Sequence, residues 1–136
     1  MKDLLVTVII LLTVAAARAD FKSRYIDGVK DSIEPCAKEN GLTGQSPEDI
    51  FDKDSSTGVD QPSCLRSCIL KSNEHIKDSK LNVEVINKFV SHVFAGQPDV
   101  IKTQQENVAK CIEEVKNVQE ECKMAYSFIQ CMMDKF

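Results

Sequence analysis

The sequence predicts an all-α protein, a compact bundle of about six helices stapled by disulfide bonds. Three observations predict it. Apolar residues recur every three or four positions over most of the chain after residue 20, which is the period of a helix with one buried face. Strand signals are weak, because no Asn-Gly or Asp-Gly turn stands between alternating runs. Six cysteines in a chain of 136 residues are enough for three bridges.

Length and composition narrow the class of protein further. A chain of 136 residues has room for one domain, and 43% hydrophobic with 28% charged residues is typical of a globular protein. A formal net charge of −4 argues against a nucleic-acid partner, since phosphate binding needs a basic surface.

The N-terminus has the features of a secretory signal peptide. Lys2 supplies the positive start, an uncharged run covers Leu4 to Ala17, and Ala17-Arg18-Ala19 is a small-x-small cleavage site. The run is too short to span a bilayer, which needs about 20 apolar residues. We therefore expect a signal peptide over residues 1–19 and one helical domain over residues 20–136. The mature protein should be secreted, where cysteines oxidise to disulfides.

The first helix of the domain is expected from residue 21 and ends at Gly41, a typical residue after a helix C-terminus. Its buried positions recur at intervals of four, four, four and three residues, and they are Phe21, Tyr25, Val29, Ile33 and Cys36.

Two further helices follow in the first half. Ser46 is a good N-cap and Pro47 suits the first helical turn, so a short helix begins there and ends before the polar loop at residues 52–58. A third helix is expected from about Gln61 to Asn73.

Three helices are expected in the second half. Asn82 can cap the fourth, which Gly96 ends, and Pro98 opens the fifth. The sixth covers roughly Glu121 to Met133. No glycine or proline separates the last two helices, so their boundary is weakly marked.

Helix geometry restricts the cysteine pairing. Cys64 and Cys68 lie one turn apart on one helix and cannot pair with each other. On a continuous helix Cys111 and Cys122 would be roughly 16 Å apart, and Cys122 and Cys131 roughly 13 Å, beyond the ~7 Å that a bridge allows. Eight of the fifteen possible pairings remain open at this point.

The spacing Cys-x27-Cys-x3-Cys-x42-Cys-x10-Cys-x8-Cys closely resembles the signature of insect odorant-binding proteins, a family that includes pheromone-binding proteins. The resemblance covers most of the chain after the leader. It implies an all-α bundle around an apolar cavity, held by three interlocked disulfides, Cys36–Cys68, Cys64–Cys122 and Cys111–Cys131. Because an empty cavity costs stability, such bridges would offset that cost.

The resemblance also implies a ligand pocket among the first, third, fourth, fifth and sixth helices. Matching positions relative to the cysteines are Ile26, Val29, Leu70, Val90, Val108, Ile112, Met124, Phe128 and Met132. Phe89 and Phe94 are neighbouring candidates on the fourth helix, and Phe136 can fold back against the cavity as a flap. Aliphatic and aromatic walls bind an apolar ligand by burial, and methionines adapt to its shape. The alternative for each residue is that it belongs to a solid core.

Polar side chains would orient such a ligand. The residues available for a hydrogen bond are Tyr25, Ser91, Tyr126 and Ser127. Any pH-dependent release would depend on His75, His92 and pairs of acidic residues, since five residues after Cys131 are too few for a long inserting tail.

The predicted function is that of a secreted carrier of small hydrophobic molecules, with an odorant or pheromone as ligand and a membrane odorant receptor as a further partner. A monomer or a weak homodimer is expected. Motifs for hydrolases, zinc proteases and phosphate-binding loops are absent, so we expect no enzyme, no cofactor and no metal. Two alternatives are a carrier outside olfaction and a helical signalling or venom-type protein that acts through its surface.

Overall fold

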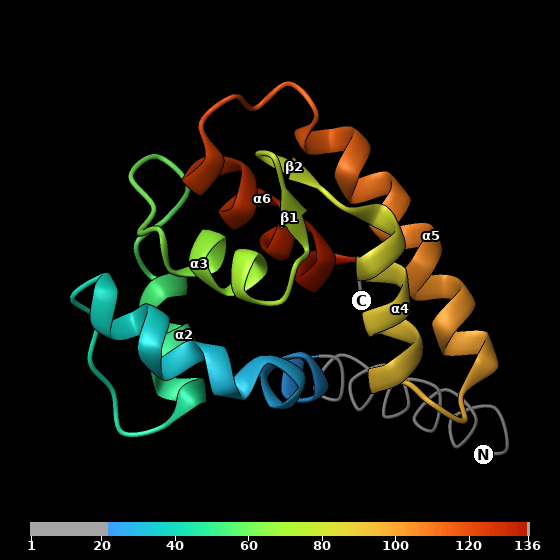
Figure 1. The fold of residues 1–136 in the computed structure, drawn as a ribbon, viewed down its shortest axis with the longest axis horizontal. Helices are drawn as coiled ribbons and strands as arrows, with labels where there is room; N and C mark the ends of the chain where they lie inside the picture. Colours follow the sequence, from blue (N-terminus) through green and yellow to red (C-terminus); the bar gives the residue numbers. More distant parts are fainter. Residues whose placement is uncertain (1–21, 136) are drawn as a thin grey trace, which may run out of the picture.

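The computed structural model describes residues 22–135, which form six helices and one small sheet (Figure 1). The first helix covers 22–39 of this range. The other elements are α2 (Pro47–Ser55), α3 (Leu65–Ser72), β1 (Ile76–Lys77), β2 (Lys80–Leu81), α4 (Val83–Val93), α5 (Pro98–Val115) and α6 (Glu121–Asp134). The predicted all-α class is confirmed, because the two strands have only two residues each.

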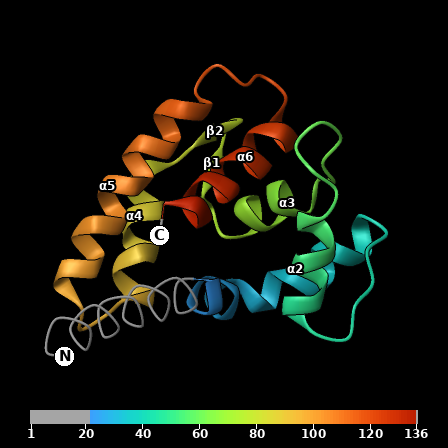
Figure 2. The ribbon, with the colours of Figure 1, turned by 180° about the vertical axis from the view of Figure 1, so that it is seen from behind.

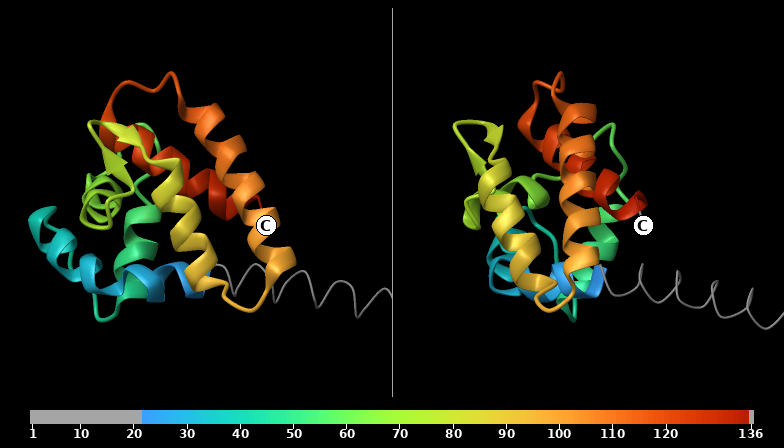
Figure 3. Two further views of the ribbon diagram at one scale, coloured as in Figure 1. Left: turned by 45° about the vertical axis from the view of Figure 1, so that its right-hand side comes forward. Right: turned by 90° about the vertical axis from the view of Figure 1, so that its right-hand side faces the viewer.

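The helices are arranged around a central pair. α3 and α6 pack against each other in the middle of the molecule, and α6 also packs against α5. α4 and α5 lie side by side as an antiparallel pair on one side, while α2 lies on the opposite side (Figures 1 and 2). The first helix runs along the base of this arrangement from beneath α4 towards the α2 side (Figure 3). One continuous cluster of buried apolar residues joins all six helices.

Helix ends follow local signals in the sequence. The Ser46 hydroxyl accepts the backbone N–H of Asp49 at 3.1 Å, which caps α2 as predicted. The Asn82 side chain accepts the N–H of Val85 at 3.4 Å and caps α4. Gly41 and Gly96 adopt φ values of +67° and +87° after their helices, a conformation that glycine reaches without strain.

Two boundaries differ from the predicted ones. α2 continues to Ser55, so the first residues of the expected loop are helical. α3 begins at Leu65 and not near residue 61. The reason for both is a contact between distant residues, because the Ser63 hydroxyl donates to Asp54 and accepts the N–H of Leu65 at 3.2 Å. This contact lengthens α2 at its C-terminal end and moves the start of α3 to a later residue.

The sequence reading missed a hairpin between α3 and α4. β1 pairs antiparallel with β2, with Ile76 opposite Leu81. The turn residues Asp78 and Ser79 have φ values of 53° and 62°, which suits the tight turn of a two-residue hairpin. Neither turn residue is glycine, so the usual signal for such a turn is absent from the sequence.

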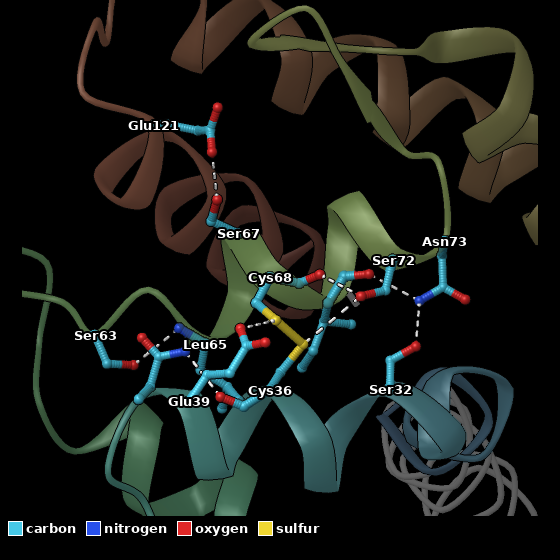
Figure 4. Close-up of a disulfide and its surroundings, with 12 residues drawn as sticks. Ser32, Cys36, Glu39, Ser63, Leu65, Ser67, Cys68, Ser72, Asn73 and Glu121 are labelled. Carbon is cyan, nitrogen blue, oxygen red and sulfur yellow. Dashed lines mark hydrogen bonds between the residues drawn. A yellow bond between two sulfur atoms is a disulfide. The ribbon is translucent and has the colours of Figure 1, made fainter.

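All three disulfides implied by the family resemblance are present. Their Cα–Cα distances are 5.6 Å for Cys36–Cys68, 4.9 Å for Cys64–Cys122 and 5.7 Å for Cys111–Cys131. The first joins the first helix to α3, and Glu39, Ser72 and Ser67 lie around it (Figure 4). The second ties the start of α3 to α6, and the third ties α5 to α6. The first two bridges therefore link segments that are distant in the sequence, and the third links the consecutive helices α5 and α6.

A buried ion pair fixes α2 against α3 and α6. Arg66 is 1% exposed and donates from Nε to Asp54 at 2.8 Å, while Asp54 is fully buried. The guanidinium also donates to Ser55 Oγ at 2.8 Å and to the carbonyl of Tyr126 at 3.2 Å. It lies 4.0 Å from the Tyr126 ring centroid and 4.7 Å from that of Phe51. Hydrogen bonds and ring contacts thus compensate a charge that burial would otherwise disfavour.

Candidate functional site: an apolar cavity

An apolar cavity lies among the first helix, α3, α4, α5, α6 and the start of the hairpin. The cavity itself has a volume of about 30 Å³. The walls are formed by Tyr25, Leu70, His75, Ile86, Phe89, Val90, Val93, Phe94, Val108, Phe128, Ile129, Met132 and Met133. In this conformation the cavity is narrow, so a larger guest would have to move wall side chains.

Helical periodicity explains the wall. Ile86, Phe89, Val90 and Val93 recur at three- and four-residue spacing and form one face of α4. α6 contributes its own apolar face across the cavity, including two flexible methionines. The wall helices α4, α5 and α6 are tied to one another, because Cys111–Cys131 joins α5 to α6 and α4 packs on α5.

An aromatic cluster stands where the first helix meets the hairpin. The Phe89 ring lies edge-on to Tyr25, with centroids 5.9 Å apart, and to His75, with centroids 4.9 Å apart. His75 is 3% exposed, and its burial lowers its pKa to about 4. Burial also raises the pKa of the Tyr25 hydroxyl, so both polar groups of the wall are uncharged at neutral pH. Gly28 lies against this cluster, and a Cβ there would be 2.9 Å from the Phe89 ring.

The structure brings part of the predicted pocket set together. The wall includes Leu70, Phe89, Val90, Val108, Phe128, Met132 and the neighbouring candidate Phe94. Ile26, Val29 and Met124 are buried in the surrounding core and do not face the cavity. Ile112 is partly buried against that core. Phe136, the proposed flap, is outside the described residues, as is the predicted signal peptide.

The four polar candidates have different places. Tyr25 is in the wall, whereas the Tyr126 hydroxyl donates to the carbonyl of Ser55 at 2.9 Å, on the α2 side. Ser91 bonds within α4 and accepts from Gln105 at 3.2 Å. Ser127 is half-buried and outside the wall. The sequence suggested His75 for pH dependence alone, and its place directly before the unpredicted hairpin is what brings it into the wall.

Two surface grooves are wider than the cavity but have different walls. One lies between the first helix and the segment leading into α2, and includes Lys30, Glu34 and Lys38. The other is beside the disulfides of α3, with Glu39, Lys71 and Glu121 in its wall. Charged side chains in both grooves stay solvated, so these surfaces do not match an apolar guest as the cavity does.

The cavity walls suit binding by burial. None of the wall residues in the described range is a lysine, arginine, aspartate, glutamate or cysteine. Residues 22–135 also hold no group of three metal-ligating side chains close enough to share an ion. No helix in that range is long and apolar enough to cross a bilayer.

Comparisons with known proteins agree with the cysteine pattern. A search among curated proteins found no match. A family model described as the PBP/GOBP family matches residues 18–135, which is most of the sequence and all three disulfides. The members of this family are binding proteins and not enzymes. The chain therefore belongs to the PBP/GOBP family, the insect odorant-binding proteins.

Proposed function

We propose that this protein reversibly binds a small hydrophobic molecule, of the odorant or pheromone type, in the cavity between α3, α4, α5 and α6. The observation that carries the proposal is the composition of the wall, which is apolar apart from two uncharged polar groups, Tyr25 and His75. An apolar guest loses no hydrogen bonds by entering such a wall, whereas a charged guest would lose its hydration.

The expected affinity follows from buried area. A guest that buries about 300 Å² of apolar surface gains roughly 7 kcal/mol, before the cost of immobilising it. This corresponds to dissociation constants of the order of micromolar or weaker. Room for the guest comes from the side chains at the end of α6, because Met132 and Met133 are flexible and change rotamer at little cost.

The site of action that fits this chemistry is extracellular. Three disulfides are stable outside the cell, and the predicted signal peptide over residues 1–19 would direct export. There the protein would keep an insoluble molecule in solution and deliver it to a membrane receptor, as a monomer or weak homodimer. A carrier outside olfaction would use the same cavity, and the tissue in which the protein is found separates the two roles.

The test is displacement of a fluorescent apolar probe in the wild type and in two variants of α5. Val108→Phe fills the cavity, and Val115→Phe is the matched control, because Val115 is also buried on α5 but lies outside the wall. We expect Val108→Phe to weaken probe binding by about tenfold or more, while Val115→Phe changes it less than about threefold. Circular dichroism checks that both variants are folded. Equal binding by wild type and Val108→Phe would contradict the proposal.

A further inference from the structure

Gln104 is a buried amide without a hydrogen-bond partner. It lies in α5 and is fully shielded from solvent, and neither its Oε1 nor its Nε2 makes a hydrogen bond to any of residues 22–135. Buried polar atoms are nearly always paired, and each orphan lowers stability. An apolar side chain of the same size would fill this place without the cost of unpaired polar atoms, so packing alone does not account for an amide at this position.

The next residue provides a contrast. Gln105 faces α4 and donates to Ser91 Oγ at 3.2 Å and to the carbonyl of Asn87 at 3.5 Å. Gln105 is therefore half-buried and hydrogen-bonded, whereas its neighbour Gln104 is fully buried and has no hydrogen bond within the described residues.

Gln104 lies on the face of α5 that borders the cavity. The helical period places it one turn before Val108, a wall residue, with Cβ atoms separated by about 5–6 Å as for any such pair. Gln104 is outside the present narrow wall. A chain molecule that widens the cavity along α5 past Val108 would reach it.

We infer that Gln104 is the polar subsite of the cavity and selects guests that carry a terminal hydroxyl group. A hydroxyl donates to Oε1 and accepts from Nε2, and so satisfies both orphaned atoms. An aldehyde or ester carbonyl accepts only, which leaves Oε1 unpaired. An ionised carboxylate is disfavoured, because the wall supplies no cation to neutralise it. This assignment rests on the proposed function of the cavity.

The test compares dodecanol with dodecanal, which share a chain length and differ in the end group. We expect the wild type to bind dodecanol about tenfold more tightly, the effect of one added hydrogen bond. Gln104→Met should remove this preference while keeping the affinity for dodecanal within about twofold. Gln105→Met is the matched control and should keep the preference.

Two measurements accompany the affinities. Thermal unfolding should show Gln104→Met at least as stable as the wild type, because the orphaned amide is gone. In the wild type, the side-chain amide signal of Gln104 in nitrogen-resolved NMR should shift more with dodecanol than with dodecanal, a readout that needs no variant. Binding of both compounds without preference, or a preference that survives in Gln104→Met, would overturn the assignment while leaving the carrier function intact. Failure of the wild type to bind either compound would overturn both.

Discussion

The interiors of the two sides of the bundle differ in polarity and in packing. On the α2 side a charged pair, Asp54 and Arg66, is fully enclosed, and each group is matched by hydrogen bonds or ring contacts. On the α4–α5 side the interior is apolar, flexible at Met132 and Met133, and incompletely filled. Directional polar contacts define one geometry, whereas apolar contacts tolerate several.

The α2 side therefore contributes mainly to stability, and the α4–α5 side mainly to binding. A cavity lowers stability because its wall atoms lack neighbours, so the fold must be held from elsewhere. The ion pair and the bridge Cys64–Cys122 hold α2, α3 and α6 together away from the cavity. We therefore expect damage on the α2 side to reduce stability, and small changes on the α4–α5 side to alter binding.

The largest effect is expected from Arg66→Met. It leaves the Asp54 carboxyl buried without its partner, which should cost about 3–5 kcal/mol in the free energy of unfolding. Urea denaturation measures this loss. Any variant protein that remains folded should bind the apolar probe within about threefold of the wild type, because the ion pair is outside the cavity wall.

The matched control is Lys22→Met, which breaks a second ion pair to α2, this one from the first helix. Lys22 and Asp52 form an ion pair at 2.5 Å whose side chains are 42% and 58% exposed, so its loss should cost less than about 1 kcal/mol. Equal costs for the two variants would show that burial of the Asp54–Arg66 pair has no special energetic role.

Removal of single disulfides should rank next. Loop-closure entropy predicts a cost of roughly 4 kcal/mol for Cys64–Cys122, which spans 58 residues, and roughly 3 kcal/mol for Cys111–Cys131, which spans 20. Replacement of each pair by alanines and urea denaturation test the order. The shorter bridge joins two walls of the cavity, so its loss should also weaken probe binding more. If removal of Cys64–Cys122 weakened probe binding more than removal of Cys111–Cys131, the claim that only the shorter bridge supports the cavity would be contradicted.

Acid should destabilise the cavity side through His75. Unfolded histidine takes up a proton below its usual pKa of 6.5, whereas buried His75 does so only near 4. The unfolded state therefore binds more protons between these values, and stability falls as the pH drops through this window, by up to roughly 3 kcal/mol. Urea denaturation between pH 7 and pH 4 measures the slope.

A second acid-sensitive group acts at lower pH. The hydrogen bond from Lys71 holds the pKa of Glu121 below its usual value of 4.5, so the stabilisation that the Glu121 carboxylate provides is lost only as the pH falls below that value.

Two variants test the role of His75. His75→Leu should flatten the dependence of stability on pH above pH 5, while replacement of the exposed His92 by glutamine should leave that dependence unchanged. An unchanged slope in His75→Leu would rule out this source of acid sensitivity.

The smallest change in stability is expected from Gly28→Ala. The new Cβ would lie 2.9 Å from the Phe89 ring and from a methyl group of Val93. Both side chains line the cavity and would have to shift. The gain in helix propensity offsets part of this strain, so stability should change by less than about 1 kcal/mol. Probe affinity should fall several-fold, because Phe89 is pushed into the cavity. Asp31→Ala, exposed on the same helix, is the control and should leave affinity unchanged.

Local signals in the sequence were enough for most helix ends. Ser46, Asn82 and Pro98 act within one turn of their own helices, so their effect is visible without knowledge of the fold. The hairpin at residues 76–81 was missed because its turn has no glycine. The pairing of Asp54 with Arg66 was missed as well, since isolated charges are normally solvated and nothing in their spacing shows that they meet.

The cavity wall could be predicted only in part for a related reason. Periodicity identifies the inward face of each helix, but it does not tell which part of that face meets solid core. Val29 and Val108 are both fully inward, yet only Val108 borders the cavity. That distinction depends on how six helices pack together. His75 enters the wall through the hairpin, so it could not be placed without that turn.

The most direct test of the account locates a bound guest. NMR spectra of methyl-labelled protein with dodecanal should show nuclear Overhauser effects from the alkyl chain to the methyl groups of Val90, Val108 and Met132. Effects to Ala37, Leu42 and Ile50 in the wider groove beside the first helix, with none to the cavity residues, would contradict the claim that the cavity is the binding site.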